Sequence, residues 1–261
     1  MKKAVFFDID GTLLDCLNGI TDITPAVKKA IRELQKSGNY VFIASGRPYA
    51  FISSEILNFG FDGYIFTNGA QVRLGDKLIY KRPFNKNFTK ELILNCDKLN
   101  IQYILQGEKY SYLNNDFERL YSYYDNYGIS RRYLTGDYDI DKVDVFKMEM
   151  LYSSKQALDY CFSKVNEDYN YGLDSSNSVF ELYSRRDSKA SGIKKVLKYL
   201  NIPLENSYAF GDDTNDIEML EAVGCGIAMG NASNMVKSHA DKATDEVQRD
   251  GVALGIERFI L

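Results

Sequence analysis

Histidine and cysteine are scarce in this chain of 261 residues, and their scarcity excludes several kinds of site. His239 is the only histidine, so a zinc motif built on two histidines cannot form, and a histidine-based acid–base scheme would depend on one side chain. The four cysteines form no Cys-x-x-Cys pair, which argues against a zinc ribbon or a thioredoxin-like redox site. Any chemistry in this protein is therefore expected to depend on carboxylates.

A large excess of charge of one sign is also missing. Lys and Arg together number 32 and Asp and Glu number 36, which leaves a net charge of −4 at pH 7. This balance gives no electrostatic reason to expect binding to nucleic acid or to an anionic membrane. No stretch reaches the ~18 uncharged residues of a membrane span, and the apolar run at 4–7 is too short for a signal peptide. With so few cysteines, these features predict a cytoplasmic protein.

Short apolar runs alternate with helical patterns near both ends of the chain. Runs typical of buried strands occur at 4–7, 40–44, 64–66, 207–210 and 225–229. Helices are predicted at 25–37, where Thr24 and Pro25 form a start signal, and at 48–59, 189–200 and 216–223. Alternation of strand and helix predicts an α/β fold with a doubly wound, Rossmann-like parallel sheet.

The middle of the chain differs in composition and pattern, because it contains most of the 20 tyrosines and longer amphipathic stretches. Helices are predicted there at 90–100 and 154–166, and strands at 102–105, 110–113, 146–151 and 179–183. We therefore expect an inserted α+β domain at 82–185. Residues 1–81 and 186–261 would then form the parallel-sheet core.

Polar clusters stand where predicted strands end or a predicted helix begins. The clusters are Asp8-Ile9-Asp10-Gly11-Thr12, Ser45-Gly46-Arg47, Lys189, and Gly211-Asp212-Asp213-Thr214-Asn215-Asp216. Ligands of open α/β sheets bind at the carboxyl ends of the strands, so up to five carboxylates are expected near one crevice. Such carboxylates repel one another unless a cation binds between them or a proton is held. Oxygen ligands of this kind suit a hard divalent cation, and Mg²⁺ is the expected ion.

The same clusters contain donors for an anion. A serine hydroxyl, a lysine and helix N-termini beside a Mg²⁺ site describe a phosphate pocket. One aspartate can then act as a nucleophile, and Asp10 could protonate the leaving oxygen if the backbone after Asp8 stays extended. Taken alone, Lys189 would be read as a solvated helix lysine and Ser45 as a helix N-cap. The functional interpretation depends on the clusters occurring together.

The clusters also carry a resemblance to a known family. The run Asp8-Ile9-Asp10-Gly11-Thr12-Leu13-Leu14 resembles the first motif of the haloacid dehalogenase-like (HAD) phosphatases. Ser45, Lys189 and the run 211–216 are similar to the second, third and fourth motifs, in the same order. The insert, with Thr67-Asn68-Gly69-Ala70 before it and Gly230-Asn231-Ala232 near the end, resembles the Cof-type subfamily with an α/β cap. Ser45 stands where many members have threonine, which keeps the hydroxyl.

The resemblance implies a role for each acidic residue of the motifs. Asp8 would be the nucleophile that forms an aspartyl-phosphate, and also a metal ligand. Asp10 would be the general acid and then the general base, with its backbone carbonyl on the metal. Asp212 would be the other carboxylate ligand, and Asp213 and Asp216 would orient ligands and water.

The resemblance also implies how the phosphoryl group is bound. Ser45, the amide of Gly46 and Lys189 would hold phosphate oxygens. Asn215 would contact the phosphoryl group and fix Lys189. Mg²⁺ and Lys189 would supply the positive charge that lets a carboxylate approach a phosphate dianion.

The sequence therefore predicts a Mg²⁺-dependent phosphatase that acts on a small phosphorylated metabolite, such as a sugar phosphate, with 82–185 as a substrate-specificity domain. Two alternatives stay open. One is a sugar phosphomutase, which would return the phosphoryl group to another hydroxyl. The other is a phospho-aspartate signalling protein that stores the group. The oligomeric state and the substrate itself are not predicted.

Overall fold

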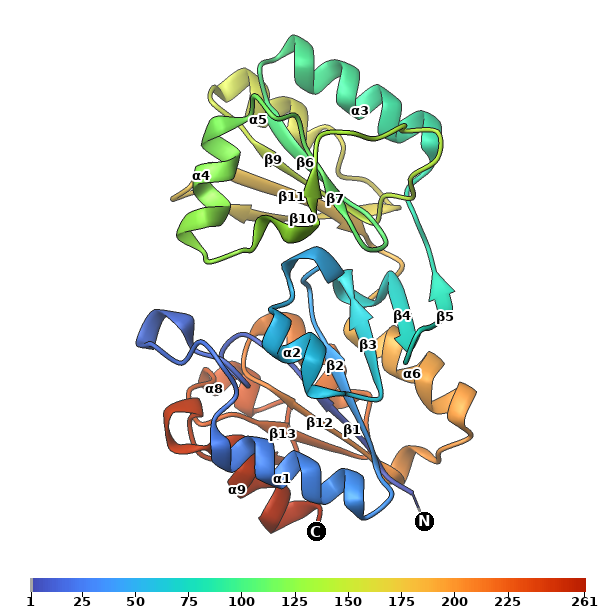
Figure 1. Ribbon diagram of the computed structural model, residues 1–261, viewed down its shortest axis with the longest axis vertical. Coiled ribbons are helices and arrows are strands. Elements are labelled where there is room, and N and C mark those ends of the chain that lie inside the picture. Colours follow the sequence, from blue (N-terminus) through green and yellow to red (C-terminus); the bar gives the residue numbers. More distant parts are fainter. Residues whose placement is uncertain (1) are drawn as a thin grey trace. The chain divides into compact units, whose positions relative to one another are not determined.

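Two compact units make up the chain in Figure 1, a computed structural model that describes residues 2–261. Unit 1 comprises the chain up to Gly46, Ser54–Tyr80 and Asp187–Leu261. Unit 2 comprises Arg47–Ser53 and Lys81–Arg186. Most of unit 2 is thus an insertion between two segments of unit 1.

Unit 1 is built on an eight-stranded sheet in the order β14-β13-β12-β1-β2-β3-β4-β5. The strands are β1 (Ala4–Phe7), β2 (Tyr40–Ala44), β3 (Gly63–Phe66), β4 (Gln71–Leu74), β5 (Lys77–Lys81), β12 (Ser207–Gly211), β13 (Cys225–Ala228) and β14 (Lys242–Ala243). Neighbours from β14 to β3 are parallel, and β4 runs antiparallel to β3. Sequentially distant strands therefore pair at the centre, where β1 lies between β12 and β2.

Six helices of unit 1 are α1 (Pro25–Lys36), α2 (Ser54–Phe59), α6 (Lys189–Leu200), α7 (Ile217–Glu221), α8 (Asn234–Lys237) and α9 (Gly251–Phe259). Thr24 caps α1 by accepting a hydrogen bond from the Val27 amide. Apolar side chains of α6, α7 and α8 pack with Phe6 and Phe42 of the sheet in one buried cluster, and α1 contacts α9. The predicted α/β fold with a doubly wound parallel sheet is confirmed.

Unit 2 contains a six-stranded sheet in the order β10-β11-β9-β6-β7-β8. Its strands are β6 (Gln102–Gln106), β7 (Ser111–Tyr112), β8 (Leu134–Thr135), β9 (Lys147–Leu151), β10 (Tyr169–Asp174) and β11 (Val179–Ser184). Its helices are α3 (Lys86–Lys98), α4 (Glu118–Asn126) and α5 (Lys155–Phe162). One buried cluster of apolar side chains joins α3 and α5 to the sheet, and a second joins α4 to it. The predicted inserted α+β architecture matches this mixed unit.

The segment Arg47–Ser53 departs from the sequence prediction. Instead of one helix over 48–59, the chain forms a 3₁₀ turn at Tyr49–Phe51 and then α2. The helix is interrupted because Ile52 is extended, with φ −82° and ψ 132°. Ala50 and Phe51 are buried in the α4 cluster of unit 2. None of the helices in the described part of the chain combines the length and the apolarity needed to span a bilayer.

Candidate active site

The register of the sheet in unit 1 brings the predicted site residues to one edge. Phe7 of β1 pairs with Phe210 of β12 and with Ile43 of β2. The next residue along β1 is Asp8, whose amide donates a hydrogen bond of 3.0 Å to the Phe210 carbonyl. Asp8, Ser45 and Asp212 therefore follow the carboxyl ends of neighbouring parallel strands, as the sequence predicts.

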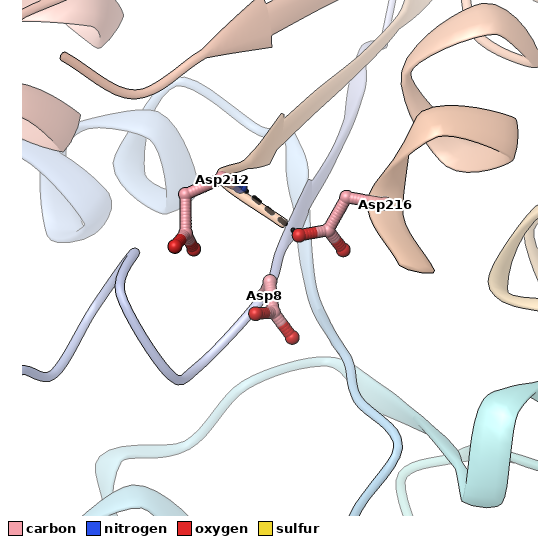
Figure 2. A group of neighbouring side chains, drawn as sticks. All are labelled: Asp8, Asp212 and Asp216. Carbon is pink, nitrogen blue, oxygen red and sulfur yellow. Dashed lines mark hydrogen bonds between the residues drawn. The ribbon is translucent and has the colours of Figure 1, made fainter. Parts of the chain in front are cut away.

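Three carboxylates gather at this edge. One carboxylate oxygen from each of Asp8, Asp212 and Asp216 lies within 4.8 Å of the other two (Figure 2). Asp8 and Asp216 are buried and Asp212 is partly buried. Asp10 is exposed on the turn after β1 and does not belong to this group.

Lys189 is the cation that lies among these carboxylates. It stands in the first turn of α6, which Ser188 caps, and only 1% of its surface is exposed. Its Nζ donates to Asp8 Oδ1 at 2.7 Å and to Asp216 Oδ1 at 2.6 Å, and it reaches Asn215 Oδ1 at 3.5 Å. Burial lowers the pKa of Lys189, but attraction to Asp216 and Asp8 outweighs burial and holds the pKa above its usual value. The ammonium group is therefore charged.

Asp216 is occupied by contacts within the protein. Besides Lys189, its carboxylate accepts hydrogen bonds from the amides of Asp212 at 3.0 Å and Asp213 at 3.2 Å. Figure 2 shows the first of these. Asp213 is exposed and its carboxylate caps its own turn at the Thr214 amide. Asp216 thus fixes both Lys189 and the loop, which leaves Asp8 and Asp212 as the carboxylates best able to bind a ligand.

Asp212 is held by residues that the sequence motifs contain but to which sequence reasoning assigns no role. Thr12 Oγ1 donates to Asp212 Oδ1 at 2.9 Å. Asn231 Nδ2 donates to the Gly11 carbonyl at 2.8 Å and lies 3.4 Å from Asp212 Oδ2. Both residues belong to runs that carry the family resemblance, Thr12 to the first motif and Asn231 to the run 230–232. Sequence reasoning could have found both residues only from their position in those runs.

The electrostatics of the group favour binding of a cation. Burial, followed by repulsion from Asp216, raises the pKa of Asp8 well above its usual value, although Lys189 lowers it. Burial also raises the pKa of Asp212 to about 7, with the Thr12 hydrogen bond opposing the shift. Buried oxygen donors with this excess of negative charge fit a hard divalent cation. The donor set of the site is therefore suited to a divalent metal.

The predicted phosphate-binding residues lie on loops of the same unit. Ser45 is buried after β2, and its amide donates to the Ile65 carbonyl at 2.8 Å. Gly46 is partly exposed, and Asn215 is exposed in the turn before α7. Asn215 Oδ1 lies 3.5 Å from Lys189 Nζ. The fold and this site define an α/β protein in which a group of carboxylates surrounds one buried lysine at the carboxyl edge of a parallel sheet.

Comparison with known proteins identifies the family. The family model of the haloacid dehalogenase-like hydrolases matches residues 5–256. The chain is 31% identical to YkrA of Bacillus subtilis (strain 168), named as a candidate phosphatase, over 99% of this chain and 98% of that protein. It is 28% identical to the 5-amino-6-(5-phospho-D-ribitylamino)uracil phosphatase YcsE of the same organism, over 99% and 96%. The chain belongs to the haloacid dehalogenase-like hydrolase family.

Solved structures agree with this assignment. A hypothetical protein from Geobacillus kaustophilus HTA426 superposes with a TM-score of 0.88 at 28% identity, over 99% of this chain and 98% of that chain. The HAD subclass IIB sugar phosphatase BT4131 superposes with a TM-score of 0.79 at 27% identity, over 99% of both chains. The protein is thus an enzyme of the HAD type, and the relatives described above carry phosphatase names.

Proposed function

We propose that this protein is a Mg²⁺-dependent phosphatase that hydrolyses a small phosphorylated metabolite, a sugar phosphate or a similar compound, through a phosphorylated Asp8. The contact of Asp8 Oδ1 with Lys189 Nζ at 2.7 Å, inside the group of carboxylates, is the observation that carries the proposal. A carboxylate that is buried, oriented by a cation and placed beside a second metal-binding carboxylate suits nucleophilic attack on phosphorus. Sugar phosphatase BT4131 and the ribitylaminouracil phosphatase YcsE support the choice of a small substrate.

Mg²⁺ would be held by the carboxylates of Asp8 and Asp212, with the backbone carbonyl of Asp10. When bound, the ion supplies positive charge that offsets the repulsion between the Asp8 carboxylate and the phosphate dianion. Gly11 supports this assignment because an added Cβ there would lie 2.0 Å from Asp212 Oδ2. The backbone therefore passes close enough to Asp212 to contribute to the same site.

The reaction then proceeds as two successive displacements at phosphorus, in which residues of the chain take part. A carboxylate oxygen of Asp8 forms a bond to phosphorus while the ester P–O bond breaks, and the Asp10 carboxyl gives its proton to the leaving alkoxide oxygen. Water next attacks the phosphorus, Asp10 takes one proton from it, and the Asp8–phosphorus bond breaks to release inorganic phosphate. Lys189, Ser45 and the Gly46 amide would hold the phosphoryl oxygens, and Asn215 would assist Lys189. Asp213 and Asp216 would orient the groups around them.

The division of labour along the chain is part of the same proposal. Residues 1–81 and 186–261 would form the catalytic core, and 82–185 would act as the cap that selects the substrate. A cytoplasmic location fits four cysteines that are all free thiols.

The replacement Asp8→Asn tests the proposed mechanism. An amide cannot form the phosphorylated intermediate, so kcat for an aryl phosphate should fall by about three orders of magnitude or more. Phosphate release is measured beside circular dichroism, which reports folding. Asp76→Asn, at an exposed aspartate of the same unit, is the matched control and should keep full activity. Undiminished turnover by the folded Asp8→Asn protein would refute the covalent mechanism.

A further inference from the structure

The turn that follows β3 has an unusual backbone. Thr67, Asn68 and Gly69 have φ values of 47°, 53° and 92°, so three consecutive residues occupy the left-handed region. A β-branched residue such as Thr67 is rarely found there, because its side chain crowds the backbone. Strained conformations of this kind persist where the surrounding structure enforces them, and they occur often at functional sites.

Two neighbouring elements enforce the turn. The Asn68 amide donates to the Ser45 carbonyl at 3.1 Å, which ties the turn to the predicted phosphate loop. Gly69 lies against the N-cap of α6, since an added Cβ would be 2.1 Å from the Ser188 carbonyl oxygen. The residue after Ser188 is Lys189. The turn therefore connects the loop of Ser45 to the helix start that positions Lys189.

Two polar atoms of the turn are buried without a hydrogen-bond partner among the described residues. They are Thr67 Oγ1 and Asn68 Oδ1. Buried polar groups are paired in most proteins, because leaving them unpaired costs free energy. Asn68 Oδ1 adjoins the phosphate loop, since a Cβ added to Gly46 would lie 3.0 Å from it. An acceptor without a partner thus lies beside the loop that is expected to hold the substrate's phosphate.

We propose that Asn68 determines specificity by accepting, through Oδ1, a hydrogen bond from a hydroxyl group of the substrate's alcohol part. This inference rests on the proposed phosphatase function. Phosphoryl oxygens of a dianion are themselves acceptors, so the partner of Asn68 Oδ1 must be a donor close to the ester. Phosphate esters of polyhydroxylated alcohols carry such a hydroxyl, and simple alkyl or aryl phosphates do not. The favoured substrates are therefore phosphorylated sugars and polyols.

Paired substrates and paired variants test this assignment. Glycerol 3-phosphate and n-propyl phosphate share a three-carbon chain and differ only in two hydroxyls. The wild-type enzyme should favour glycerol 3-phosphate in kcat/KM by about tenfold or more. Asn68→Gly removes the side chain without backbone strain and should abolish that preference. Asn68→Asp keeps oxygen acceptors and should keep the preference, with both substrates slowed alike by the added charge.

Asn201→Gly is the matched control, because Asn201 has the same φ of 53° and is exposed at the end of α6. It should leave the substrate preference unchanged. An equal loss of kcat/KM on both substrates in Asn68→Gly would overturn the inference. A wild-type enzyme with the same kcat/KM for the two substrates would also overturn it. A wild-type protein that releases no phosphate from either ester counts against the proposed function alone. In that case, calorimetric binding of the two esters tests the role of Asn68. The wild-type protein should bind glycerol 3-phosphate more tightly than n-propyl phosphate, and Asn68→Gly should bind the two esters equally.

Discussion

Gly11 is the residue at which one added methyl group would disturb the candidate active site most directly. Its φ is +77°, and a Cβ there would lie 2.0 Å from Asp212 Oδ2. Gly19 has a similar φ of +84°, but a Cβ there would meet no atom within 4 Å. The two glycines therefore share a backbone conformation and differ in surroundings. Comparing them separates backbone strain from displacement of the carboxylate.

Gly11→Ala should weaken binding of the metal. Both Gly11→Ala and Gly19→Ala place alanine at a positive φ, which costs roughly 1 kcal/mol of stability. Only Gly11→Ala also displaces Asp212, so the Mg²⁺ concentration needed for half-maximal activity should rise about tenfold or more. The measurement is a Mg²⁺ titration of phosphatase activity after removal of metal by a chelator. Equal Mg²⁺ requirements in the two variants would contradict the placement of Asp212 at the metal site.

At the scale of elements, β9 and β11 carry an ion cluster on one face of the unit 2 sheet, in which Lys147 and Glu149 are buried and Glu181 is partly exposed. Lys147 Nζ lies 2.8 Å from Glu181 Oε2 and 3.6 Å from Glu149 Oε1. Tyr124 of α4 also donates to Glu149. The alternate residues of β9, Met148 and Met150, belong to the apolar cluster with α3 and α5. Charge therefore alternates with apolar packing along one strand, as the two-residue period of β structure allows.

Glu149 should give the stability of the protein a specific dependence on pH. Burial raises the pKa of Glu149 above its usual value; Lys147 lowers it, and Glu181 raises it further. The folded chain thus binds this proton more tightly than the unfolded chain does. The proton on Glu149 stabilises the folded state. This stabilisation is complete below the pKa of the unfolded state, near 4.5, and is lost as the pH rises through the higher pKa of the folded state. The glutamine in Glu149→Gln cannot titrate, so the variant lacks this pH-dependent contribution to stability.

The free energy of unfolding of Glu149→Gln relative to wild type should therefore rise as the pH increases above about 4.5. Urea unfolding at several pH values measures it. Glu91→Gln is the control, because Glu91 pairs with Lys164 at 2.9 Å but is 57% exposed. Its difference from wild type should stay nearly constant over the same range. A flat difference for Glu149→Gln would show that the carboxyl titrates normally.

At the scale of the whole molecule, the chain enters unit 2 twice. Arg47–Ser53 follows β2 of unit 1 directly, yet its side chains pack with unit 2. The ring of Phe51 lies 4.8 Å from that of Tyr124 between centroids, and the ring of Tyr49 lies 5.2 Å from that of Tyr133. Unit 2 is therefore completed by a segment far from the main insertion in sequence. Its boundaries at 81/82 and 185/186 stay a prediction.

Phe51→Ala should destabilise unit 2 selectively. Removal of a buried phenyl ring costs about 3–5 kcal/mol, and this ring packs against α4 of unit 2. Amide hydrogen exchange, followed by mass spectrometry, should speed up in β6 and β9 more than in β1. Phe59→Ala, in α2 of unit 1, should produce the opposite pattern. Faster exchange in β1 alone after Phe51→Ala would contradict the assignment of Arg47–Ser53 to unit 2.

Local patterns predicted the elements that position the site. Apolar runs located β1, β2 and β12, and the start signal at Thr24 and Pro25 located α1, because these features depend on neighbours in sequence. The helix over 48–59 was wrong, since burial of Phe51 in unit 2 overrides local helical spacing. No pattern predicted α4 or α9. The polar and aromatic α4 is ordered mainly by tertiary packing of Leu120 and Tyr124.

By itself the sequence determined the fold class and which polar clusters end strands, since both follow from periodicity and motif order. Only the tertiary structure decided how those clusters meet. Lys189 contacts Asp8 across 181 positions in the chain, and Asn231 contacts Gly11 across 220. Such contacts depend on sheet register and buried packing, which no local pattern specifies. The inclusion of Asp216 in the carboxylate group and the unpaired oxygen of Asn68 became visible for the same reason.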